Sequence, residues 1–184
     1  MGRLDSTEQR ILLFSVFFLS LCGIIYELVL GSLATYLLGN PVQQYSITIG
    51  VFLSSMGLGS FLSRYINGNL VKNFILIEAL LGFTGGICVI LLTYLFSFST
   101  LFYLLHVFFL IIIGTLVGLE IPLLTRIMKK YGSLKEVLSN ILTLDYLGGL
   151  AGSLLFPLVL FPFAGRFLTS LIIEIGRASC RERV

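Results

Sequence analysis

Apolar residues along this chain fall into five long runs separated by short polar segments. Each run is long enough to cross a bilayer as a helix, which takes about 20 residues. The runs cover residues 11–38, 43–63, 74–96, 101–124 and 137–161. Turn-forming residues separate them, at 39–41, 67–69, 97–100 and 129–132. The pattern predicts an all-α fold, specifically a polytopic transmembrane helix bundle with five complete spans.

The fifth run has its own start signal, and the chain after it is harder to interpret. Ser133 and Glu136 have the spacing of a capping box. Residues 166–173 begin like a sixth span, but eight helical residues rise only about 12 Å. Residues 174–184 resemble the translation of a sequencing-library adapter. We expect an amino-terminal segment over 1–10, a helical domain over 11–173 and a non-native tail over 174–184, with the natural chain longer; a native basic tail is the alternative.

Positive charges predict the orientation of the spans. Lys and Arg fall in the second and fourth connections, as Arg64, Lys72, Arg126, Lys129, Lys130 and Lys135. The first and third connections contain neither residue type. Because positive residues concentrate in cytoplasmic loops, the amino terminus and the even connections are expected to be cytoplasmic, with the lipid bilayer around the spans.

Composition supports a membrane protein and gives little sign of catalysis. The 184 residues are 57% hydrophobic and only 11% charged, against about 25% charged in soluble domains. The net charge of +3 is too small and too spread to predict nucleic-acid binding. The three cysteines lack disulfide or metal spacing, and the glycine motifs follow no predicted strand. We therefore assign no catalytic, cofactor-binding or metal-binding residue.

Three of the predicted spans carry a carboxylate on a stripe of small residues. The stripes are Ser20, Gly23, Glu27, Gly31 and Ala34; Glu78, Gly82, Gly85 and Gly86; and Asp145, Gly148, Gly149, Gly152 and Ser153. Acids at membrane depth are costly and usually mark function. Small residues let membrane helices approach closely. The stripes predict a packed polar interior.

The individual acids allow different interpretations. Glu27 has no Lys or Arg at its depth, so it is protonated, paired with His106 or bound to a cationic ligand. His106 is otherwise expected to be an interfacial, hydrogen-bonded histidine. Glu78 lies near the cytoplasmic start of its span, where partial hydration is expected. Glu120 lies near a cytoplasmic end and can pair with Arg126 or another basic loop residue.

Asp145 and the prolines complete the set of unusual positions. Asp145 lies deeper and is followed by Tyr146, which favours a buried polar network. Pro122 and Pro157 each remove one helical hydrogen bond and leave the carbonyl four residues earlier without its donor. Such a carbonyl can face a neighbouring helix or a cation, although a tolerated kink is the commoner outcome.

Five sequence motifs, in order, resemble the membrane portion of bacterial polyamine aminopropyltransferases, which are spermidine-synthase-like proteins with amino-terminal transmembrane helices. They are Cys22-Gly-Ile-Ile-Tyr-Glu-Leu-Val, Tyr36-Leu-Leu-Gly-Asn, Met56-Gly-Leu-Gly-Ser, Gly118-Leu-Glu-Ile-Pro-Leu-Leu and Leu144-Asp-Tyr-Leu-Gly-Gly-Leu-Ala-Gly-Ser-Leu-Leu-Phe-Pro. The resemblance covers residues 11–173. It implies a protein of the bacterial inner membrane and a Rossmann-like catalytic domain beyond this chain.

The resemblance also implies a reaction. Such proteins transfer an aminopropyl group from decarboxylated S-adenosylmethionine to putrescine, giving spermidine and methylthioadenosine. No catalytic residue carries over to this chain, so the fragment alone is expected to be inactive. Only the membrane motif residues carry over, each with its role open: Tyr26, Glu27, Glu120, Pro122, Asp145 and Tyr146.

Two functions for the helices stay open from sequence. They either anchor a catalytic domain, or bind and move a polyamine or another cation through the buried carboxylates. An unrelated small transporter or a scaffold protein is a third, weaker alternative. A homo-oligomer is compatible with each.

Overall fold

Five long α-helices make up most of the chain. The computed structural model describes residues 2–94, 99–129, 132–163, 165, 168–169 and 172. The helices are α1 (Gly2–Leu38), α2 (Pro41–Leu62), α3 (Leu70–Tyr94), α4 (Ser99–Met128) and α5 (Leu134–Leu155). A short helix η1 (Ser63–Tyr65) follows α2, and a π-helical turn η4 (Phe156–Leu160) follows α5. The described residues contain no strand, which confirms the all-α prediction.

The helix boundaries agree with the apolar runs, with extensions at the ends. Five helical segments are long and apolar enough to cross a membrane by length and composition. Helix α1 starts at Gly2, well before the first apolar run, because polar residues such as Glu and Arg are themselves good helix formers. The π-helical turn of η4 includes Pro157, where a helix irregularity is predicted. Most of the predicted sixth segment and the whole tail over 174–184 lie outside the described residues.

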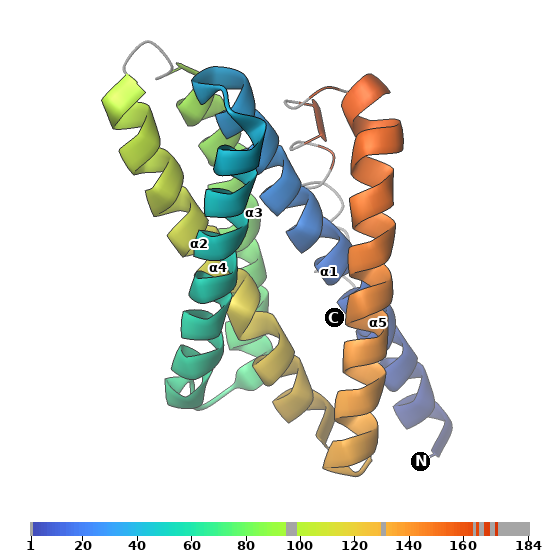
Figure 1. Cartoon of the computed structure of the whole chain (residues 1–184). Coiled ribbons are helices and arrows are strands. Elements are labelled where there is room, and N and C mark those ends of the chain that lie inside the picture. The colour runs from blue at the N-terminus through green and yellow to red at the C-terminus, as the bar shows by residue number, and fades with distance from the viewer. Residues whose placement is uncertain are drawn as a thin grey trace.

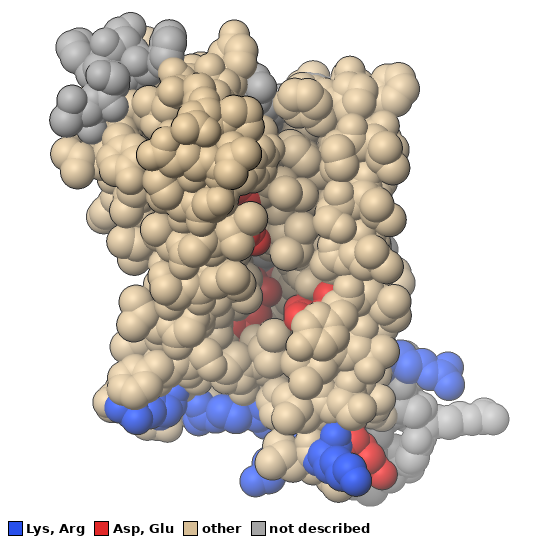
Figure 2. Space-filling view, viewed as in Figure 1, with Lys and Arg blue, Asp and Glu red and all other residues tan. Residues whose placement is uncertain are grey.

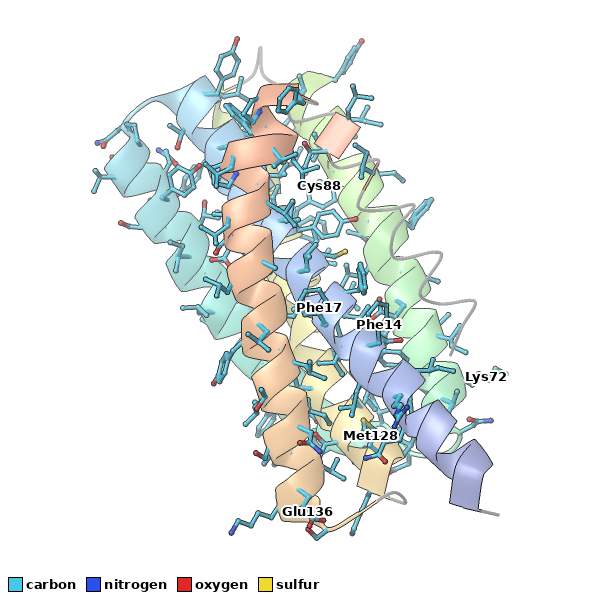
Figure 3. All side chains as sticks on the ribbon, turned by 90° about the vertical axis from the view of Figure 1, so that its right-hand side faces the viewer. Phe14, Phe17, Lys72, Cys88, Met128 and Glu136 are labelled. Carbon is cyan, nitrogen blue, oxygen red and sulfur yellow. The ribbon has the colours of Figure 1, made fainter. Side chains whose placement is uncertain are left out.

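Successive helices run in alternating directions, so the connections gather at two ends (Figure 1). The amino terminus, the α2–α3 connection and the α4–α5 connection lie at one end, which we call the basic end. Its Lys and Arg side chains form a band in Figure 2 and include Arg64, Lys72, Arg126, Lys129 and Lys135. In Figure 3, Lys72, Met128 and Glu136 lie at this end, and Cys88 lies toward the other.

The turns form as their residues predict. Gly39 and Asn40 both have positive φ, at 74° and 48°, a conformation that glycine and asparagine tolerate best. The Asn40 side chain then accepts a hydrogen bond from the backbone N–H of Gln43, next to Pro41 at the first turn of α2. At the start of α5, Ser133 and Glu136 form both hydrogen bonds of the predicted capping box.

Two closely packed helix pairs organise the bundle. The most extensive contacts are those of α2 with α4 and of α1 with α5. At Gly118 of α4, an added Cβ would overlap the backbone of Met56 in α2. At Gly148 of α5, it would overlap the carbonyl oxygen of Phe17 in α1. Two glycine motifs with a four-residue spacing therefore lie at close-packing surfaces: Gly114 and Gly118 in α4, and Gly148 and Gly152 in α5.

The bundle interior consists of two apolar clusters stacked along its length. The cluster nearer the basic end includes Leu12, Val16, Phe74, Leu123, Met128 and Ile141. The other includes Ile25, Val29, Phe52, Leu81, Leu110 and Ile113. In α1 the boundary between them falls between Leu19 and Cys22, and in α4 between Val117 and Leu119. Polar side chains gather at this level.

Candidate functional site

A pocket lies where the two apolar clusters meet, between α1, α2, α4 and α5. Its volume is about 70 Å³, enough for a few water molecules. The lining residues are Ser20, Gly23, Ile24, Phe52, Met56, Val117, Glu120, Ile121 and Asp145. Figure 2 shows acidic side chains inside the hollow between α5 and the other helices. The pocket is partly open, because α5 is in extensive contact with α1 alone.

Glu120 and Asp145 bring two carboxylates to this pocket from different helices. Glu120 is 5% exposed, and Asp145 is half-buried. Glu120 lies eight residues before Met128, about 12 Å along α4 from the basic end. Asp145 lies eleven residues after Leu134, about 16 Å along α5 from the same end. Because the two helices are antiparallel neighbours, their carboxylates reach a similar height.

Ser20 of α1 fixes the position of Asp145. Its hydroxyl donates a 2.6 Å hydrogen bond to the backbone carbonyl oxygen of Asp145. An added Cβ at Gly148 would lie 3.1 Å from the Cβ of Ser20, and one at Gly149 would lie 3.7 Å from its hydroxyl oxygen. The small-residue stripes of α1 and α5 therefore pack against each other, as their composition predicts.

Glu27 lies one helical turn beyond the pocket on the same face of α1. It is 9% exposed, and within the described part of the chain no hydrogen bond or ion pair holds its carboxylate. Helical side chains incline toward the amino terminus of their helix, over the residues three and four positions earlier. For Glu27 those residues are Ile24 and Gly23, which line the pocket. The Glu27 side chain itself is not among those that line the pocket.

The predicted pairing of Glu27 with His106 does not form. His106 is buried and stacks on Phe102, with 5.8 Å between the ring centroids. Its Nε2 lies 3.4 Å from the Thr48 hydroxyl oxygen, which satisfies the expected hydrogen bond, and its Nδ1 has no partner among the described residues.

Tyr26 and Glu78 belong to the α1–α3 side of the bundle and not to the pocket. The Tyr26 ring occupies the space above Gly85, where an added Cβ would lie within 2.8 Å of the hydroxyl oxygen. Glu78 is only 4% exposed, so the expected partial hydration is corrected by the structure. Neighbouring helices cover this acid despite its position near the start of α3.

Two further expectations change when the helices are assembled. Tyr146 is 71% exposed, so it lies outside the buried network expected around Asp145. Arg126 donates hydrogen bonds from Nη1 to the carbonyl oxygens of Ser63 and Ile66, at 3.0 and 2.8 Å. It thus joins α4 to the end of η1, whereas Glu120 faces the pocket.

Pro122 lies inside α4, which continues to Met128. Its side chain is half-buried, and the residue before it, Ile121, lines the pocket. A proline in a helix leaves the carbonyl four residues earlier without its usual donor, and here that residue is Gly118 at the close contact with α2. The tight packing there fits the tolerated-kink interpretation.

The pocket combines two carboxylate-bearing residues with apolar walls. In the described residues, no group of three His, Cys, Asp or Glu side chains is placed to hold a metal ion. Apolar side chains from three helices form much of the wall, including Ile24, Phe52 and Val117. Sequence analysis missed that Glu120 and Asp145 line the same pocket. The available signal was their similar distance from the basic end.

Comparisons with known proteins indicate the lineage of this helical bundle. The chain is 44% identical over 167 residues to a polyamine aminopropyltransferase of Leptospira interrogans, covering 91% of this chain and 34% of that protein. It is 42% identical over 170 residues to polyamine aminopropyltransferase 2 of Ralstonia nicotianae, covering 91% and 33%. It is also 40% identical over 162 residues to polyamine aminopropyltransferase 2 of Aquifex aeolicus, covering 85% and 32%.

These matches relate the chain to one region of spermidine-synthase-like proteins. The chain spans about a third of the length of the curated relatives it matches. No family model matches it, and no solved structure matches it.

Proposed function

We propose that this chain is the membrane region of a polyamine aminopropyltransferase. The observation that carries the proposal is the sequence similarity, which covers 91% of this chain in several proteins of that name. Each helix has the length and apolarity of a membrane span. The complete protein would transfer an aminopropyl group from decarboxylated S-adenosylmethionine to putrescine, giving spermidine and methylthioadenosine.

In this proposal the helices hold the catalytic part at the cytoplasmic surface. The relatives are about three times as long as the matched region, so ample sequence remains for a catalytic domain. Basic residues at one end of the bundle support an orientation with that end in the cytoplasm, in a bacterial inner membrane. The residues of this chain would then determine where the protein is located, how it assembles or how it binds an amine. They would not take part in the transfer itself.

The transferase proposal is tested with the complete coding sequence from which the chain derives. Membranes and cytosol of expressing cells are separated, and each is given labelled decarboxylated S-adenosylmethionine with putrescine. We expect methylthioadenosine to form in the membrane fraction and only when putrescine is present. A truncated variant that lacks residues 1–163 should move the remaining activity to the cytosol. Absence of product from the complete protein would contradict the transferase, and activity of the complete protein in the cytosol would contradict the anchor.

A further inference from the structure

An ordered arginine lies on the outer surface of the bundle at its basic end. Arg64 belongs to η1, the short helix that follows α2. Its guanidinium carbon lies 3.6 Å from the ring centroid of Phe61 and 4.7 Å from that of Tyr65. Its Nη2 also donates a 2.7 Å hydrogen bond to the Tyr65 hydroxyl. Because all three side chains are exposed, the two rings hold the guanidinium in place without burying it.

Arg126 of α4 brings a second guanidinium to the same turn. Its Nη1 donates to the carbonyl oxygens of Ser63 and Ile66, the residues on either side of Arg64 and Tyr65. A carbonyl oxygen carries no net charge, so these bonds position Arg126 without cancelling its positive charge. Two positive charges from different helices therefore lie at one short segment, residues 63–66.

No acid lies near this turn in the sequence. Asp and Glu are absent from the whole stretch between Glu27 and Glu78, which includes all of α2 and η1. Within the described residues, no ion pair joins Arg64 to a carboxylate. By contrast, Lys135 at the same end of the bundle is followed directly by the exposed acid Glu136. The turn at 63–66 therefore presents positive charge that a bound anion can complement.

An apolar face continues from this turn into the span. Leu58, Phe61 and Leu62 of α2 are large apolar side chains, and all three are exposed. The segment Pro41–Tyr65 has the length and apolarity of a membrane span, so in the proposed placement these side chains meet acyl chains. A free phosphate ion would use only the charged part of this surface, whereas a phospholipid would use both parts.

We infer that the surface formed by Phe61, Arg64, Tyr65 and Arg126 binds one anionic phospholipid of the cytoplasmic leaflet. The Arg64 guanidinium holds the lipid phosphate, Arg126 adds its positive charge, and an acyl chain lies along Phe61 and Leu58. The inference rests on the membrane placement proposed above and adds a lipid partner to it. It does not depend on the transferase activity, because every residue of the surface lies in α2, η1 or α4.

The test measures lipid binding to this chain by native mass spectrometry in a detergent without net charge. Dioleoyl phosphatidylglycerol, which is anionic, is compared with dioleoyl phosphatidylcholine, which has no net charge. The first phosphatidylglycerol should bind at least about tenfold more tightly, because two arginines face its headgroup. Glycerol 3-phosphate at the same concentration lacks acyl chains and should not displace it. Equal affinity for the two lipids, or displacement by glycerol 3-phosphate, would overturn the inference and leave the membrane placement and the transferase proposal standing.

Two variants of Arg64 and one matched control separate a defined site from the general positive charge of the basic end. R64Q removes the charge and should weaken phosphatidylglycerol binding about fivefold. R64K keeps the charge but loses the planar fork and its stacking face, so binding should weaken at least about threefold. The control K135Q removes an exposed cation at the same end and should change binding by less than about twofold. Equal losses in R64Q and K135Q, or unchanged binding in R64K, would overturn the inference.

A measurement on the unaltered chain guards against variants that fail to fold. Phosphatidylglycerol with a photoreactive diazirine in its acyl chain, close to the glycerol, is crosslinked to the chain by light. The modified residues are then identified by mass spectrometry. We expect the crosslinks to concentrate on residues 58–66, at the end of α2 and in η1, and to be rare at the start of α5. Crosslinks spread evenly over the basic ends of all helices would contradict a single site.

Discussion

The contact between α2 and α4 at Gly118 allows a quantitative test of the packing. In Gly118→Ala, the new Cβ would fall on the carbonyl oxygen of Met56 and only 2.6 Å from its Cα. Ordinary van der Waals contact begins at 3.4 Å, so the contact with this Cα alone requires the helices to separate by at least about 0.8 Å (3.4 Å less 2.6 Å), and the nearer carbonyl oxygen requires more. Overpacking of this kind lowers the free energy of unfolding by about 1–3 kcal/mol.

Gly57→Ala is the matched control for this substitution. Gly57 lies in α2 on an exposed face, and an added Cβ there meets no atom within 4 Å. Both substitutions gain similar helix propensity, up to about 1 kcal/mol, which cancels when the two variants are compared. The difference between them isolates the clash with α2.

The assay follows thermal unfolding with a thiol-reactive dye in detergent. Cys22 and Cys88 are buried and form no disulfide in the described residues, so their thiols react when the bundle opens. Cys180 is replaced by Ser in every variant to remove its background signal. At about 2–4 °C for each kcal/mol, Gly118→Ala should melt at least about 2 °C below Gly57→Ala. Equal midpoints, or a lower midpoint for Gly57→Ala, would refute the close approach of α2 and α4.

Three further substitutions test individual contacts in the same assay. Ser20→Ala removes the hydroxyl donor to the Asp145 carbonyl and should cost about 0.5–1.5 kcal/mol; an unchanged midpoint would speak against that bond. Ser133→Ala removes the cap of α5 and should cost about 0.5–2 kcal/mol, with faster hydrogen exchange confined to the first turn of α5. Arg126→Gln should cost about 1 kcal/mol more than Lys129→Gln, because only Arg126 of the two donates to the end of η1. If both variants lose the same stability, the effect comes from the removed charge and not from the hydrogen bonds of Arg126.

The parts of the fold that the sequence could predict are those that depend on residues close together in the chain. A helix needs only its own residues to satisfy its backbone, so long apolar runs indicate the five helices directly. The Asn40 turn and the Ser133 cap likewise depend on residues within one turn of each other. The glycine motifs of α4 and α5 predict close packing, because a helix surface without side chains can admit a neighbour.

The site was harder to predict because it depends on how each helix is rotated against its neighbours. Asp145 and Tyr146 are adjacent in sequence, yet consecutive helical residues lie about 100° apart around the axis, so one lines the pocket and the other is exposed. Glu27 and His106 are similar in depth, but His106 contacts Thr48 of α2 and no hydrogen bond joins it to Glu27 in the described residues. The depth of a residue in the bundle can be counted from its position in one helix. The partner of its side chain depends on how all the helices pack together.

The central claim is that these helices form a membrane bundle with the basic end in the cytoplasm, and a topology map tests it most directly. Alkaline phosphatase is active only when exported, and green fluorescent protein fluoresces only when it stays inside. Each reporter is fused after Asn40, Gly68 and Gly132. We predict phosphatase activity after Asn40 alone and fluorescence after Gly68 and Gly132. The opposite pattern would contradict the orientation, and fluorescence at all three positions would contradict a membrane bundle.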